Sequence, residues 1–163
     1  MRHVFFSFDW DDAWRAFQVR NSWVPKGNTA AGFVDSADVE KVKRQSPSTI
    51  EKWIDAQLHG TSVTCVLIGA ETYTREYVKY EIQKSIERKN GLMGIYIHQI
   101  HDSHRQTGSK GTDPFKCPPF NFKPIKDGRM NYPCCSYHDW IGDDGFNKMN
   151  SWIESAYKQS HGT

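Results

Sequence analysis

Long apolar runs and a strong net charge are both missing from this sequence of 163 residues. No run approaches the roughly eighteen apolar residues that a membrane-spanning helix needs, so we expect no membrane partner. The formal net charge is only +2, which argues against a broad nucleic-acid interface. A small anion held by one or two cations and a helix N-terminus is compatible with this balance.

The N-terminal segment also lacks the features of a secretory signal peptide. It reads MRHVFFSFDWDD, and its short apolar run is followed at once by Asp9, Asp11 and Asp12. A signal peptide would need a longer apolar region and a small-residue cleavage site. We therefore expect a cytoplasmic protein. The length suits one domain with a full core, spanning residues 1–163.

Cysteine is scarce, with four residues in the chain: Cys65, Cys117, Cys134 and Cys135. No C-x2-C pair is present, and two adjacent cysteines are a poor arrangement for ligands of one zinc ion. Cys65 lies in a predicted buried strand, where it acts as a small apolar residue. We expect reduced thiols, as is usual in the cytosol.

Three histidines, His98, His101 and His104, are spaced three apart, which on a helix could gather a metal ion. They fall where a predicted strand becomes a loop, so no common helical face is expected there. We predict no metal site.

Strand-like and helix-like segments alternate along the chain. Predicted strands are His3–Phe8, Gly32–Ser36, Ser62–Ile68, Leu92–Ile100 and the edge strand Cys134–Trp140. Predicted helices are Asp11–Val19, Ser48–His59, Thr74–Lys89 and Asp144–Gln159. This alternation is typical of a three-layer α/β domain with helices on both faces of a mostly parallel sheet. For five strands we predict the flavodoxin-like order 2-1-3-4-5.

Turn residues and caps mark the boundaries between these elements. Asn21–Ala31 contains Pro25, Gly27 and Asn28 and is predicted to be a loop. Ser48 and Glu51 are spaced as a capping box for the helix that ends before Gly60. Gln99–Pro133 is predicted to be a long irregular insertion, of a length that is usually functional.

The predicted strand order places a ligand-binding crevice at the carboxyl ends of the first and third strands. The first strand ends at Phe8–Asp12 and the third at Gly69–Thr72. In the helix that follows, Tyr77 and Glu81 are four residues apart and share one face. Glu81 also borders the apolar stripe of that helix. We therefore predict a half-buried carboxylate at the crevice, with an aromatic ring one turn before it.

Ordinary structural roles compete with this interpretation. Glu81 could be a solvated side chain that pairs with Lys84, and at least one of the aspartates after the first strand is expected to cap a helix. Two other chemistries of this scaffold fit poorly. Receiver domains need an aspartate where this sequence has Gly69-Ala70, and the acidic loop after the first strand would repel the phosphate that flavodoxins bind there.

Several motifs resemble those of TIR (Toll/interleukin receptor) domains. V-F-F-S-F with W-D-D resembles the first TIR strand, and T-C-V-L-I-G followed by T-Y-T-R-E-Y-V-K-Y-E-I resembles the third strand and the W-x-x-x-E-L helix after it. S-F-D-W-D-D, V-R-N-S-W-V and Y-V-K-Y-E-I together resemble the bacterial TIR-like family that includes the Thoeris anti-phage sensor. The resemblance covers roughly the first hundred residues.

The resemblance implies an enzyme that consumes NAD as its substrate and needs no other cofactor. Glu81 occupies the position of the glutamate that is essential in catalytic TIR domains, while Tyr77 replaces the usual tryptophan. Thoeris sensors are switched on by infection, through a phage-derived trigger. They cleave NAD to a cyclic ADP-ribose isomer, which activates a separate effector protein.

A carboxylate suits this chemistry. Loss of nicotinamide from NAD leaves positive charge on the ribose, and a nearby carboxylate stabilises such an oxocarbenium-like state. Nicotinamide already leaves from a cationic ring, so no general acid is required. Attack by water gives ADP-ribose, whereas attack by a hydroxyl of the distant adenosine gives a cyclic product. Exclusion of water decides between them.

Further residues are expected to line the substrate pocket. Aromatic side chains can stack on the nicotinamide or adenine ring, and guanidinium groups can bind the pyrophosphate. The substrate-binding candidates are Ser7, Phe8, Asp9, Trp10, Asn21 and Tyr77. The candidates for the pyrophosphate are Arg15, Arg20 and Arg75.

Two alternatives remain open from the sequence. Many TIR domains act by self-association, so the chain could be a non-catalytic interaction module, and an enzyme of this kind could also work as a homo-oligomer. A nucleoside-processing transferase would use a carboxylate at the end of an α/β sheet in a similar way. The sequence does not decide the product, the trigger or the oligomeric state.

Overall fold

The computed structural model describes residues 2–34, 38–120, 122 and 132–162 of the chain. Its centre is a five-stranded sheet with the order β2-β1-β3-β4-β5, in which every neighbouring pair of strands is parallel. The strands are β1 (His3–Phe8), β2 (Thr29–Ala31), β3 (Val63–Ile68), β4 (Gly91–Tyr96) and β5 (Cys135–Asp139). The predicted α/β class and strand order are confirmed.

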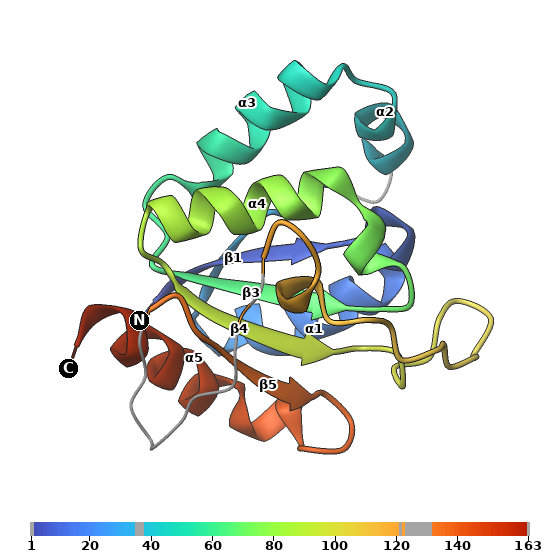
Figure 1. The fold of residues 1–163 in the computed structure, drawn as a ribbon. Helices are drawn as coiled ribbons and strands as arrows, with labels where there is room; N and C mark the ends of the chain where they lie inside the picture. Colours follow the sequence, from blue (N-terminus) through green and yellow to red (C-terminus); the bar gives the residue numbers. More distant parts are fainter. Residues whose placement is uncertain (1, 35–37, 121, 123–131, 163) are drawn as a thin grey trace.

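Helices cover both faces of this sheet. Figure 1 shows α3 and α4 on one side and α1 and α5 on the other. The α-helices are α1 (Ala13–Trp23), α2 (Val39–Lys43), α3 (Pro47–Leu58), α4 (Glu76–Glu87) and α5 (Gly145–His161). Short 3-10 helices are η1 (Trp10–Asp12), η2 (Val24–Lys26), η4 (Thr72–Thr74) and η5 (Pro114–Lys116). Every helix in the described ranges is too short or too polar to cross a membrane.

Alternation along β1 sends its side chains into two different cores. Phe6 and Phe8 belong to the same cluster as residues of α1 and α5, whereas Phe5 packs with Ile54 and Leu58 of α3. Because successive side chains of a strand point to opposite faces, Ser7 lies on the Phe5 face, under α3 and α4. This strand therefore brings one polar side chain into an apolar layer.

The second strand is shorter and earlier than predicted. The prediction of a loop over Asn21–Ala31 is wrong, because α1 continues to Trp23 and β2 occupies Thr29–Ala31. The prediction of a strand over Gly32–Ser36 is wrong as well, because β2 ends at Ala31. Gly32 follows β2 with φ +90°, and a Cβ there would clash with the carbonyl oxygen of Phe6. The chain turns away from the sheet at this glycine. Residues 35 and 36 of the predicted strand lie outside the described residues.

The start of α3 also differs from the prediction. Ser46, and not Ser48, is the N-cap, since its side chain accepts from the backbone N–H of Thr49 and Pro47 occupies the first turn. Proline at this position lacks only an N–H that would have no helical partner. The predicted capping box of Ser48 and Glu51 is therefore wrong. Gly60 does follow the helix in a left-handed conformation, with φ +79°.

The segment after β4 folds back over the carboxyl end of the sheet. β4 ends at Tyr96 and not at Ile100. The Arg15 side chain donates from Nε to the Ile100 carbonyl at 2.7 Å and from Nη2 to the Gln106 carbonyl at 3.1 Å. Further along, Gly111 lies so close to the Gly69 carbonyl that a Cβ would clash with it. The described part of the predicted insertion is thus held against the rest of the domain by these contacts. Residues 121 and 123–131 lie outside the described residues.

Candidate active site

Glu81 lies on the face of α4 that packs against the sheet. Only 2% of its surface is exposed, and the other buried residues of this helix are Val78, Ile82 and Ser85. Lys84, the partner expected for a solvated Glu81, pairs instead with Glu87 at 3.2 Å. The carboxylate is therefore more deeply buried than the half-buried position predicted from the sequence.

The surroundings of Glu81 favour its neutral form. Burial raises the pKa of this carboxyl to about 8, and the Ser7 hydroxyl, itself fully buried, opposes this shift in part. Ser7 Oγ is close enough to Glu81 for this effect, yet within the described residues neither Ser7 Oγ nor Glu81 Oε2 forms a hydrogen bond of normal geometry. Two buried polar atoms without partners are unfavourable for stability, and such atoms in a native protein call for an explanation. A ligand that bonds both would supply one.

An aromatic pair lies next to Glu81 and joins two elements: Tyr77 is one turn before Glu81 on α4, and Trp10 belongs to η1. The Tyr77 and Trp10 rings stack with centroids 4.0 Å apart and planes 11° apart. The backbone N–H of Trp10 donates to the Tyr77 hydroxyl at 2.7 Å, and this hydroxyl lies 3.4 Å from Asp9 Oδ1, to which it donates. Burial, chiefly, raises the pKa of Tyr77. Tyr77 thus ties α4 to the segment that follows β1.

This geometry explains why tyrosine stands at position 77 in place of tryptophan. The Tyr77 hydroxyl accepts one hydrogen bond and donates another. An indole N–H only donates, so a tryptophan would leave the Trp10 N–H without its acceptor. Tyrosine therefore satisfies the Trp10 N–H, which the tryptophan of the W-x-x-x-E pattern would not.

Removing the Tyr77 hydroxyl is expected to destabilise the protein. Tyr77→Phe should lower the free energy of unfolding by about 1–2 kcal/mol, because the buried Trp10 N–H loses its partner. Tyr80→Phe is the matched control, since the Tyr80 hydroxyl bonds Asp55 at an exposed site. Urea unfolding of both variants measures the difference. Equal losses in the two variants would contradict the role assigned to the Tyr77 hydroxyl.

A network of charged groups borders the aromatic pair. Asp9 is buried, accepts from the Asp11 N–H at 3.1 Å and pairs with Arg75 Nε at 3.1 Å. Arg75 Nη2 also pairs with Asp11 Oδ2 at 3.0 Å, and Lys43 of α2 pairs with Asp11 Oδ1. The hydrogen bond from Lys43, above all, lowers the pKa of Asp11. Lys43 was not predicted from the sequence, because nothing local indicates that α2 lies next to η1.

The remaining predicted residues lie apart from this cluster. Phe8 is on the other face of the sheet, with its ring 5.2 Å from Phe33. Asn21 is exposed in the last turn of α1 and accepts a hydrogen bond from Arg20. Arg15 is occupied by Asp12 and by carbonyls of the segment after β4. Among the described residues, no hydrogen bond, ion pair or ring contact joins Phe8, Asn21 or Arg20 to Glu81.

A groove of about 450 Å³ runs between α3 and α4, on the outer side of Tyr77. It is lined by Pro47, Ile50, Glu51, Glu76, Tyr77, Lys79, Tyr80, Gln83 and Pro119. Tyr77 contributes to this lining, whereas Glu81 is buried and is not among the residues that line the groove.

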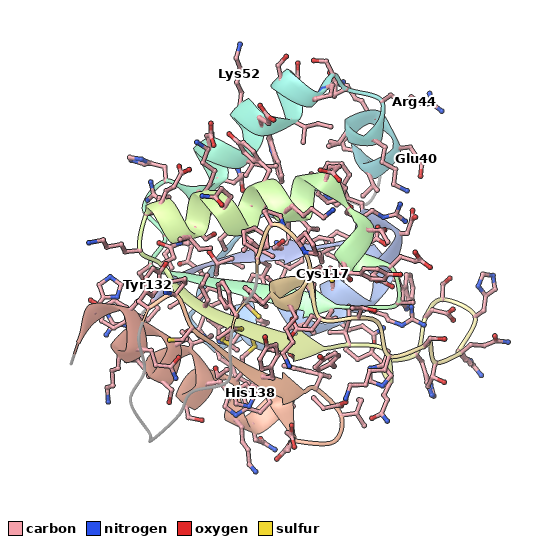
Figure 2. The ribbon with its side chains drawn as sticks, viewed as in Figure 1. Glu40, Arg44, Lys52, Cys117, Tyr132 and His138 are labelled. Atoms are coloured by element: carbon pink, nitrogen blue, oxygen red, sulfur yellow. The ribbon has the colours of Figure 1, made fainter. Side chains whose placement is uncertain are left out.

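No metal centre is formed by the described part of the chain, where no three histidine, cysteine, aspartate or glutamate side chains gather. All four cysteines are free thiols. Burial raises the pKa of Cys65, whose side chain is fully enclosed. In Figure 2, Cys117 lies near η5, while His138 lies on β5.

The fold and the cluster around Glu81 define a TIR-like domain with flavodoxin-like topology. The chain belongs to the Thoeris ThsB TIR-like family: the family model described as "Thoeris protein ThsB, TIR-like domain" matches residues 5–102. It is also 35% identical to a Bacillus cereus (strain MSX-D12) protein named "Putative cyclic ADP-D-ribose synthase ThsB1", over 93% of this chain and 98% of that protein. The resemblance found in the sequence is confirmed.

Proposed function

We propose that this protein cleaves NAD between nicotinamide and ribose and makes a cyclic ADP-ribose-type nucleotide. The observation that carries the proposal is the buried Glu81 carboxyl, without a hydrogen-bond partner for Oε2 among the described residues. Glu81 lies beside Ser7 of β1, the strand next to the switch in strand order. The name of the Bacillus cereus relative, a cyclic ADP-D-ribose synthase, supports the formation of such a nucleotide.

Glu81 acts in this proposal as an anion that stabilises the ribosyl cation. The bond between nicotinamide and C1′ of the ribose breaks, nicotinamide leaves with the bonding electrons, and positive charge develops on the sugar. A carboxylate in a water-poor site stabilises that charge far more than it would in water. The cationic nicotinamide ring favours the charged form of Glu81 when the substrate binds, which offsets the raised pKa.

The nature of the product depends on which nucleophile reaches C1′. Water gives linear ADP-ribose, and a nucleophile on the adenosine half of the same molecule gives a ring. The Trp10–Tyr77 pair and the burial of Glu81 support exclusion of water from the reacting carbon. We therefore favour a cyclic product over ADP-ribose.

In the cell, this product would act as a diffusible signal in anti-phage defence. We place the enzyme in the cytoplasm, where a phage-derived trigger would activate it and its nucleotide product would activate an effector protein. The covered Glu81 supports a resting state of low activity. A homo-oligomer formed on activation is one arrangement that would complete the site.

Nicotinamide release from NAD by the purified protein tests this proposal. Lysate from phage-infected cells supplies the trigger, and uninfected lysate is the control. We expect release that depends on both the trigger and Glu81. Cleavage of nucleosides in preference to dinucleotides would favour a nucleoside-processing transferase instead. No cleavage with any trigger preparation that activates defence in cells would favour an interaction module.

A further inference from the structure

Two cations meet on one exposed carboxylate at the edge of the candidate active site. Arg75 Nη2 lies 3.0 Å from Asp11 Oδ2, and Lys43 pairs with Asp11 Oδ1. The Asp11 side chain is 59% exposed, compared with 35% for Arg75 and 31% for Lys43. The anion in this arrangement is therefore more open to solvent than either of the cations that hold it.

The three residues come from three different elements. Asp11 is the middle residue of η1, directly after Trp10, while Arg75 immediately precedes α4 and Lys43 is the last residue of α2. Their contacts hold η1 in the position in which Trp10 stacks on Tyr77. Figure 2 labels Glu40, which also pairs with Lys43, at the outer side of α2.

Besides Asp11, Arg75 contacts Asp9 and Lys43 contacts Glu40, and each cation still has N–H donors left for an anion. Arg75 Nε lies 3.1 Å from Asp9 Oδ1, yet it forms no aligned hydrogen bond with any described residue. Asp11 offers each cation a single oxygen. A diphosphate has more oxygens and more charge, and a guanidinium fork matches its geometry. Ion pairs with an exposed carboxylate are weak, so a diphosphate can compete for the same cations. The repulsion expected from the acidic loop is reduced because Asp9 is paired with Arg75 and Asp12 with Arg15.

We propose that Arg75 and Lys43 form a binding site for a diphosphate group, and that Asp11 occupies this site in the ligand-free protein. The diphosphate of a dinucleotide displaces Asp11 from both cations. Displacement removes the contacts of Asp11 and thereby loosens η1, which carries Trp10 beside Tyr77. The identity of this ligand as NAD rests on the proposed function, whereas the anion site itself does not.

Calorimetric titration with inorganic pyrophosphate and with ADP-ribose tests the site without any turnover. Asp11→Asn removes the competing charge and should tighten binding of both probes about threefold or more, while Lys43→Met should weaken it by a similar factor. Glu87→Gln is the matched control, because Glu87 forms an exposed pair with Lys84 at the other end of α4. This control should bind both probes as the wild type does.

Hydrogen exchange provides a second readout. Binding of ADP-ribose should speed amide exchange in residues 9–12, since η1 is released, and Asp11→Asn should speed it without ligand. Circular dichroism checks that each variant is folded. If Asp11→Asn does not fold, Asp11→Ala replaces it in both experiments. Binding by an Asp11 variant that equals or falls below wild type would overturn the inference, as would wild-type affinity in Lys43→Met.

The outcomes separate this inference from the proposed function. If pyrophosphate binding follows the charges as expected but NAD is never cleaved, the anion site stands and the proposed function fails. If NAD cleavage depends on Glu81 while Lys43 and Asp11 variants bind both probes like wild type, the proposed function stands and this inference fails.

Discussion

Glu81→Gln is expected to reduce nicotinamide release from NAD by about a thousandfold. Removal of one charged or hydrogen-bonding group that stabilises a transition state lowers rates by about 10²–10³, and here the negative charge itself is lost. Glutamine keeps the size and shape of the acid but carries no negative charge, so it stabilises positive charge on the ribose far less. Turnover of NAD by the triggered protein, measured by chromatography of nicotinamide, gives the ratio.

Glu87→Gln on the same helix is the control for this experiment. Glu87 lies at the exposed end of α4 and pairs with Lys84, so its replacement should leave nicotinamide release unchanged. Residual activity of Glu81→Gln within about tenfold of wild type would contradict a direct role for the carboxylate. The remaining charge stabilisation would then have to come from another group.

The same substitution should change how stability depends on pH. The pKa of Glu81 is raised to about 8 in the folded protein by burial, whereas a glutamate in an unfolded chain has a pKa near 4.3. Between these two values the folded state binds more protons than the unfolded state, so stability falls as pH rises. The contribution of Glu81 to the free energy of unfolding is therefore greatest below about pH 4.3, falls steadily up to about pH 8 and does not change further above that.

Glutamine does not titrate, so Glu81→Gln lacks this decline. Over the full range the shift corresponds to about 5 kcal/mol, at 1.36 kcal/mol for each unit of pKa. We expect the variant to gain several kcal/mol relative to wild type between pH 5 and pH 8. Urea unfolding of both proteins at several pH values measures the difference. Parallel stability curves would mean that the carboxylate is ionised or hydrated in the resting protein.

The main parts of the fold and of the site follow from local sequence patterns. The apolar run of β1 and that of β3 predict strands buried on both faces, because a parallel sheet is covered on both sides. Helical spacing places Tyr77 and Glu81 on one face of α4. Together with the strand order, these patterns predict that Tyr77 and Glu81 lie near the carboxyl end of β1, and Tyr77 does stack on Trp10 there.

Features that depend on long-range contacts were not predictable. β2 has three residues and is defined by pairing with β1, not by its own composition. Lys43 meets Asp11 only because α2 packs beside η1, and the segment after β4 is held by Arg15. Sequence spacing carries no signal for such contacts. The full burial of Glu81 likewise depends on the arrangement of several elements at once.

Nucleotide mass spectrometry of cells is the most direct test of the central claim. Cells expressing wild type, Glu81→Gln or Glu87→Gln are compared with and without phage infection. The account predicts a new species with the mass of a cyclic ADP-ribose, formed only on infection and only when Glu81 is present. An unchanged nucleotide pool in infected wild-type cells that resist the phage would contradict it, and an interaction module would then be the better explanation.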